Sequence, residues 1–189
     1  MLDFDNYSQV LRRKYHPECV KKSFYKALDY IGGMPQDNER FAFVSVRLDK
    51  ETNRWNNASS SMNAFEFRFN RKMFKKGMRP EFQGMMNSVK SIEMNEDEGG
   101  YHWHILFRLN RLRVILTDDE LGYILRNIAI ALDEINRHDP ATPDIRFFNY
   151  DITNQNTRED AFGKALHYLC KQASPTYQPL KNIVLPRFR

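Results

Sequence analysis

The spacing of hydrophobic and polar positions predicts a chain that contains both helices and strands. Residues 8–31 carry a helical apolar stripe that is interrupted around Pro17 and ends at Gly32 and Gly33. Residues 41–48 are apolar on both faces until close to their end, which is typical of a strand in the middle of a sheet. The first quarter of the chain therefore predicts a helical segment followed by a central strand.

The stretch that follows changes from polar to amphipathic. Residues 49–60 are polar, and we expect them to form a loop. A helix is expected to run from about Ser61 or Asn63 towards Lys76, and a further helical turn is expected over 80–86.

The second half of the chain also contains both helices and strands. Thr117 and Glu120 have the spacing of a capping box and are expected to open a long amphipathic helix. Residues 145–152 predict the last strand, and residues 157–172 predict the last helix. This order predicts an α+β fold in which a central antiparallel sheet has helices packed on it.

Residues 101–107 read as a buried strand that carries two histidines two positions apart. Because successive side chains on a strand point to opposite faces, His102 and His104 share one face, while Trp103 and Ile105 share the other. Two neutral imidazoles projecting from a rigid strand are a natural half of a metal site. The alternative is a pair of strand histidines that are satisfied by ordinary hydrogen bonds.

An upstream strand supplies a candidate third ligand. Residues 88–94 are followed by a polar, glycine-containing turn, so the two strands predict a hairpin. A hairpin centred near Asp97 places Glu93 opposite His102 on the same face. A register shift of one residue would turn Glu93 away, and Glu96 and Glu98 would then be the alternative ligands.

The predicted last helix combines an apolar stripe with a polar face. Thr157 is its expected N-cap. Lys164, Tyr168 and Lys171 follow helical spacing on the side away from that stripe, so the tyrosine shares its face with two ammonium groups that suit a phosphate. A tyrosine that is simply solvated on a basic face is the alternative. The apolar stripe is formed by Phe162, Ala165, Leu166 and Leu169.

A strand carrying His102-Trp103-His104, followed by a helix carrying Tyr168-Leu169-Cys170-Lys171, resembles the HUH endonuclease superfamily. The order of the two motifs is similar to that of single-tyrosine rolling-circle replication initiators of the inovirus and plasmid type. The resemblance implies a ferredoxin-like or RRM-like core. It also implies that Glu93, His102 and His104 hold Mg²⁺ or Mn²⁺.

The same resemblance implies an activity. Tyr168 would nick single-stranded DNA at a replication origin and form a covalent 5′-phosphotyrosine, while Lys171 would orient the phosphate. A host helicase and polymerase are the expected partners, because the chain has no phosphate-binding Gly-x-x-x-x-Gly-Lys loop of its own. A related HUH transposase would share the nicking step.

Basic residues are concentrated between positions 68 and 79 and alternate with phenylalanines. The formal net charge of the chain is +5, which suits a polyanionic partner. For Phe65, Phe67, Phe69 and Phe74 we favour a place in the core, while the cations are candidates either for DNA binding or for a solvated helix face. The candidate DNA-binding residues are Arg68, Arg71, Lys72, Lys75, Lys76 and Lys164.

The sequence also predicts a domain organisation and a compartment. We expect an N-terminal helical extension over 1–35, an endonuclease domain over 36–173 and an irregular basic tail over 174–189. The two cysteines are far apart and form no metal-binding motif, and there is no signal peptide or membrane-spanning run, so a cytoplasmic protein without a membrane role is expected.

Three other classes of protein fit parts of the pattern. A cupin also uses His-x-His on a strand but would need further ligands downstream, where Arg108, Leu109 and Asn110 stand. An amidohydrolase barrel needs about 250 residues, which is more than this chain has. A DNA-binding module with degenerate chemistry remains the main alternative, and it predicts binding that survives the loss of Tyr168 and of metal.

Overall fold

The computed structural model describes residues 2–5, 18–48, 55–73, 87–95, 100–109, 117–136, 141–170 and 183–184. The elements are α2 (Glu18–Tyr30), β1 (Arg40–Leu48), α3 (Trp55–Met73), β2 (Asn87–Asn95), β3 (Gly100–Arg108), α4 (Asp118–Asn136), β4 (Ala141–Asn149), the 3₁₀-helix η3 (Ile152–Asn154), α5 (Ala161–Cys170) and β5 (Ile183–Val184). Helices and strands are mixed along the chain, and β2 and β3 follow one another as the predicted hairpin.

The strands form one antiparallel sheet in the order β4-β1-β3-β2-β5. The succession β1-α3-β2-β3-α4-β4, with β3 inserted between β1 and β2, is the arrangement of a ferredoxin-like fold. The predicted α+β class, with helices packed on a central antiparallel sheet, is confirmed. The predicted central position of the first strand is confirmed as well, because β1 lies between β4 and β3.

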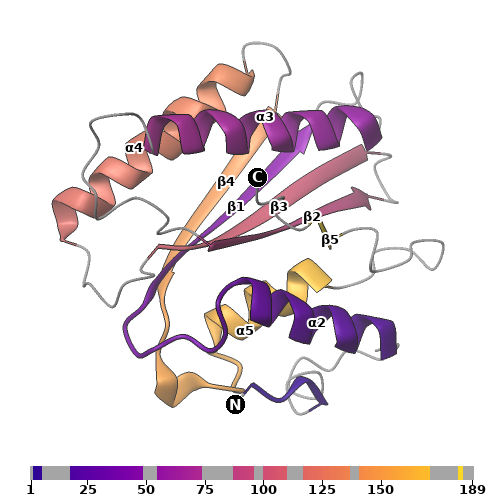
Figure 1. Ribbon diagram of the computed structural model, residues 1–189, viewed down its shortest axis with the longest axis vertical. Coiled ribbons are helices and arrows are strands. Elements are labelled where there is room, and N and C mark those ends of the chain that lie inside the picture. The colour runs from indigo at the N-terminus through magenta and orange to yellow at the C-terminus, as the bar shows by residue number, and fades with distance from the viewer. Residues whose placement is uncertain are drawn as a thin grey trace.

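Helices cover both faces of the sheet and divide the core into two layers (Figure 1). Helices α3 and α4 cover one face, where Trp103 and Ile105 are fully buried. Helices α2 and α5 cover the other face, where Leu106 is fully buried. Because alternate residues of β3 enter different layers, the even-numbered residues of this strand, including His102 and His104, belong to the α2/α5 face.

Two local predictions are confirmed in detail. The hairpin forms in the expected register, with Glu93 paired to His102. At the start of α4, the Thr117 backbone N–H donates to Glu120 Oε2 at 2.8 Å, and the Glu120 backbone N–H donates to Thr117 Oγ1 at 3.2 Å, which is the reciprocal capping box.

Two element boundaries differ from the prediction. Helix α3 begins at Trp55 inside the expected loop, because Ala58 and Met62 continue the buried stripe of the helix and tertiary packing outweighs the weak helix propensity of the asparagines and serines around them. Strand β4 begins at Ala141, before the expected residue 145. It accommodates Pro143 because β1 is the only strand that β4 pairs with among the described residues.

Helix α5 differs in the opposite direction, because it starts later than expected. The helix begins at Ala161, and Asp160, not Thr157, caps it: the Gly163 backbone N–H donates to Asp160 Oδ1 at 2.8 Å. Thr157 instead closes the preceding turn by donating from its hydroxyl to the Asn154 carbonyl at 2.7 Å. Burial raises the pKa of the Asp160 carboxyl, against the smaller opposing effect of the hydrogen bonds that it accepts from the backbone N–H groups of Gly163 and Asn156.

The segment expected as an N-terminal extension packs into the α2/α5 layer. Leu2 and Phe4 are buried, and the Phe4 ring lies 5.2 Å from Phe24 of α2 and stacks on His167 of α5 at 5.7 Å between centroids. Residues 6–17 of the predicted helix and the turn predicted at 80–86 lie outside the described residues. In the tail, which was expected to be irregular, Ile183–Val184 form the short strand β5.

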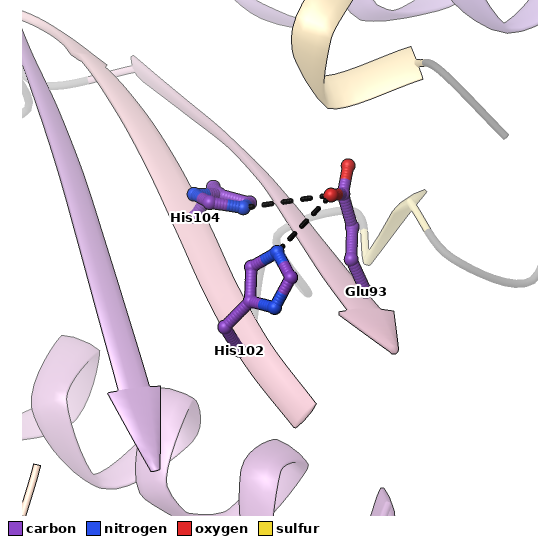
Figure 2. Close-up of side chains that lie close together, drawn as sticks. All are labelled: Glu93, His102 and His104. Atoms are coloured by element: carbon purple, nitrogen blue, oxygen red, sulfur yellow. Dashed lines mark hydrogen bonds and ion pairs between the residues drawn. The ribbon is translucent and has the colours of Figure 1, made fainter. Parts of the chain in front are cut away.

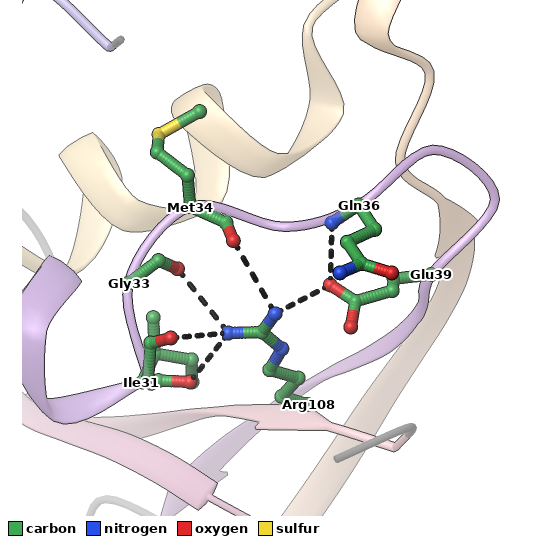
Figure 3. Close-up of polar contacts among 7 residues, drawn as sticks. Ile31, Gly33, Met34, Gln36, Glu39 and Arg108 are labelled. Carbon is green, nitrogen blue, oxygen red and sulfur yellow. Dashed lines mark hydrogen bonds and ion pairs between the residues drawn. The ribbon is translucent and has the colours of Figure 1, made fainter. Parts of the chain in front are cut away.

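A buried arginine joins three elements at the end of the sheet (Figure 3). The Arg108 guanidinium, at the end of β3, donates to the Gly32 carbonyl at 2.8 Å and to Glu39 Oε2 at 2.6 Å. Gly32 has a φ of 95°, a left-handed conformation that glycine adopts without strain. Arg108 thereby fixes the turn after α2 and the entry to β1 against the strand that carries the histidines.

We predict that Arg108→Met lowers the free energy of unfolding by about 3 kcal/mol or more, because it leaves the buried Glu39 carboxylate without its cation. The matched control is Arg146→Met, whose ion pair with Asp144 at 3.0 Å is largely exposed, with side-chain accessibilities of 75% and 55%. That control should change stability by less than about 1 kcal/mol. Urea denaturation of both variants measures the difference, and equal losses would contradict the role given to Arg108.

Candidate metal centre

Three side chains from the hairpin converge on one point (Figure 2). His102 Nε2 lies 3.2 Å from Glu93 Oε2, and His104 Nε2 lies 3.7 Å from the same oxygen. All three ligand atoms lie within 4.8 Å of one another. The hairpin register produces this convergence, because it places Glu93 opposite His102 and the strand alternation brings His104 to the same face.

The spacing of these atoms fits a shared cation. Two ligands bound at right angles, each about 2.1 Å from an ion, are separated by about 3 Å, which is close to the separations found between Glu93 and the two imidazoles. Two imidazole nitrogens and one carboxylate oxygen suit first-row divalent ions such as Mn²⁺, and the carboxylate also suits Mg²⁺. The residues therefore fit the expected divalent cation, although Glu96 and Glu98, the alternative ligands, lie outside the described residues.

The site is mostly enclosed. Glu93 is 2% exposed and His104 is 4% exposed, whereas His102 is partly exposed and marks the open side. Burial of an ionised carboxylate is costly unless positive charge or hydrogen bonds compensate it, and a cation at this point would provide the charge.

The ring of His104 is held by aromatic neighbours. It stacks on Phe43 of β1 at 5.5 Å between centroids, with 17° between the planes. The ring of His102 lies against it edge-on, at 4.8 Å and 79°. On the β1 side, Ser45 Oγ lies 2.7 Å from His104 Nδ1. The orientation of this imidazole is therefore fixed by packing as well as by hydrogen bonding.

The predicted nucleophile lies beside the candidate metal ligands. The Tyr168 ring on α5 is perpendicular to the His104 ring, with 4.9 Å between centroids, and lies edge-on to Phe43 at 5.9 Å. As expected, Tyr168 lies with exposed Lys164 on the least buried side of the helix, away from the fully buried Leu166. Lys171 lies outside the described residues, so the structure does not place the predicted phosphate-orienting group.

The predicted DNA-binding cations of α3 are not brought to this site. Helix α3 covers the opposite face of the sheet (Figure 1), and two of its cations pair with α4: Lys72 Nζ lies 3.0 Å and Arg68 Nε 3.9 Å from the Glu134 carboxylate. Arg71 is exposed on the same helix. Lys75 and Lys76 lie outside the described residues.

The phenylalanines of α3 divide between core and surface. Phe65 and Phe69 are fully buried, which confirms the expected place in the core. Phe67 is 66% exposed, which corrects that expectation for one position, because it lies on the outward side of the helix with Arg71. Phe74 lies outside the described residues.

The sequence does not predict one exposed cation that lies beside the candidate metal centre. Arg47 of β1 pairs in register with His102 and shares its face of the sheet. The alternation of residues 41–48 groups Arg47 with Phe43 and Ser45, but the pairing that brings β1 beside the histidines joins segments more than 50 residues apart. A sequence pattern alone does not contain that pairing.

Comparison with known proteins gives no relative: no family model, no curated protein and no solved structure matches this chain. In the part of the chain that the structure describes, no helix has the length and apolar character needed to cross a membrane. Fold and site together define a ferredoxin-like α+β protein with a candidate metal centre of two histidines and one glutamate on one sheet face.

We predict that Mn²⁺ stabilises the protein through this centre. A cation present at about 100 times its dissociation constant adds about 2.7 kcal/mol to the free energy of unfolding, which raises the melting temperature. Glu93→Gln should abolish the shift, because the amide lacks the charge of the ligand. Glu134→Gln, a matched change on α4, should retain it. Absence of a shift in the wild type, or equal losses in both variants, would exclude the assigned ligands.

Proposed function

We propose that this protein nicks and rejoins single-stranded DNA through a covalent phosphotyrosine and so initiates rolling-circle-type replication. The observation that carries the proposal is the contact between the rings of Tyr168 and His104, 4.9 Å apart, beside the convergent Glu93 and His102. A nucleophile next to a set of cation ligands is the arrangement that phosphoryl transfer requires. The resemblance to HUH endonucleases supplies the class of substrate.

The chain's own residues account for the main steps. When bound by Glu93, His102 and His104, a divalent cation would polarise a phosphoryl oxygen and offset the negative charge of the transition state. The Tyr168 oxygen attacks the scissile phosphorus after losing its proton to water. The bond from phosphorus to the 3′ oxygen breaks, and that oxygen takes up a proton to become a free 3′ hydroxyl.

The product of this step explains its use in replication. The 5′ phosphate remains linked to Tyr168, so the energy of the phosphodiester is conserved and the reverse attack by a 3′ hydroxyl can rejoin a strand. The free 3′ hydroxyl primes synthesis by a polymerase, which we expect a host to supply together with a helicase. Lys171 and Lys164 are the proposed contacts to the phosphate near the nucleophile.

We predict a covalent adduct between the protein and single-stranded DNA. Protein is mixed with labelled oligonucleotides from the surrounding genetic element and Mn²⁺, and is then analysed on a denaturing gel. A protease-sensitive shifted band should form, should disappear with chelator and should be absent from Tyr168→Phe. Tyr123→Phe changes an exposed tyrosine of α4 and should leave the adduct intact.

Other outcomes of this assay identify other functions. An adduct that persists in Tyr168→Phe would move the nucleophile to another residue. Absence of an adduct, together with DNA binding that needs no metal, would favour a binding module without chemistry.

We predict that Arg47, and not the cations of α3, contacts the single-stranded DNA near the candidate metal centre. Arg47→Ala should weaken binding to single-stranded DNA and reduce the dependence of log K on log salt by roughly one phosphate contact, a slope change of about 0.7. Arg71→Ala removes another exposed arginine, on the opposite face of the sheet, and should change neither quantity. If Arg71→Ala weakens binding and Arg47→Ala does not, α3 is the DNA-binding surface.

A further inference from the structure

We infer that Ser45 is a positioning residue that hydrogen-bonds Nδ1 of His104 in either tautomer and thereby lets Nε2 serve as a metal ligand; this inference rests on the proposed metal centre. Ser45 lies on β1 and pairs in register with His104 of β3. Its Oγ is 2.7 Å from His104 Nδ1, a short hydrogen bond to the ring atom that does not face Glu93.

The hydrogen bond to Nδ1 affects Nε2 because the two nitrogens of a neutral imidazole share one proton. Such a ring carries one N–H, so a proton on Nδ1 leaves the lone pair on Nε2. When Nδ1–H donates to Ser45 Oγ, the Nε2 lone pair points to the side where Glu93 Oε2 lies, 3.7 Å away, and where the cation would bind. A hydrogen bond of this kind fixes the orientation of a ligating histidine and raises its basicity.

A hydroxyl group has a further property that a carbonyl or a carboxylate lacks in this position. It can accept from Nδ1–H, and it can equally donate to an unprotonated Nδ1. Without a cation, His104 can therefore carry its proton on Nε2, towards the Glu93 carboxylate, while Ser45 donates to Nδ1. With a cation, the proton leaves Nε2, a proton is taken up at Nδ1, and the Ser45 hydroxyl rotates, so His104 remains neutral in both states.

The packing around His104 supports the ring independently of Ser45. Phe43 stacks on the imidazole and Tyr168 contacts it edge-on, at 5.5 Å and 4.9 Å between centroids. These contacts hold the ring in place without Ser45. Loss of the hydroxyl should therefore change which nitrogen is protonated more than it changes where the ring lies.

The chain offers a matched control on the other side of the same histidine. Ser91 of β2 also pairs in register with His104 and is fully buried. Its Oγ has no hydrogen-bond partner within the part of the chain that the structure describes. Ser91→Ala therefore removes the same atom from the same neighbourhood without removing a hydrogen bond to the imidazole.

The experiment measures Mn²⁺ affinity by calorimetry for the full chain and three variants. Ser45→Ala should lose roughly 10- to 100-fold in affinity, the usual effect of removing the partner of a ligating histidine. Ser45→Thr keeps the hydroxyl and should stay within about threefold of the wild type, and Ser91→Ala should do the same. Nitrogen-15 NMR of the metal-free, histidine-labelled protein should show that Ser45→Ala changes the tautomer populations of His104, because Nδ1 loses its hydrogen-bond partner.

Each outcome decides the inference. Ser45→Ala with unchanged affinity and tautomer would overturn it, as would equal losses in Ser45→Ala and Ser91→Ala. Absence of Mn²⁺ binding in the wild type would overturn it together with the metal centre. If Mn²⁺ binds and Ser45→Ala weakens it while no covalent DNA adduct forms, the inference stands and the proposed nicking function fails.

Discussion

The register between β2 and β3 is the constraint on which the rest of the site depends. Glu93 faces His102 only because the hairpin pairs these two residues, and a shift by one position would move every side chain of a strand to the other face. Core packing prevents that shift. Trp103, between the two histidines, is fully buried against α3, and the opposite face holds Leu106. A shifted β3 would expose the tryptophan and place imidazoles among apolar side chains, at a cost of several kcal/mol.

The second layer of helices brings the tyrosine to this point. Asp160 sets the first residue of α5, and Tyr168 follows two turns later, where the helix passes over Phe43 and His104. The position of α5 depends in turn on α2, which packs against it and whose following turn is held by the Arg108 guanidinium. Burial raises the pKa of the Asp160 carboxyl, because the ionised form loses hydration in this buried place.

The sequence predicts the local parts of this arrangement and fails on the non-local ones. The hairpin, its register and the Thr117 capping box lie within short segments, where alternation, turn residues and cap spacing determine the structure. The sequence does not predict that Ser45 and Arg47 lie beside the histidines, because that relation depends on the pairing of β1 with β3. The sequence pattern places the start of α3 too late, since the first turns of this helix are stabilised by packing of Ala58 and Met62 and not by propensity.

The same limit applies to the basic residues of α3, because their predicted DNA-binding role gives no position relative to the histidines. A periodic pattern tells which side of a helix is buried, but not which face of a sheet it covers, and here the sheet separates α3 from the candidate metal centre (Figure 1). On the α3/α4 side, charges are matched within the layer: Lys72 pairs with Glu134, and the buried Lys90 of β2 pairs with Glu66 of α3. Ion pairs of this kind connect helix to helix and helix to sheet. The α2/α5 side has its own buried ion pair, Arg108 with Glu39, and there a partly exposed histidine, a partly exposed tyrosine and an exposed arginine surround the two buried candidate ligands. Arg68, Lys72 and Lys90 are therefore paired within the α3/α4 layer, whereas the candidate metal centre lies on the face that α2 and α5 cover.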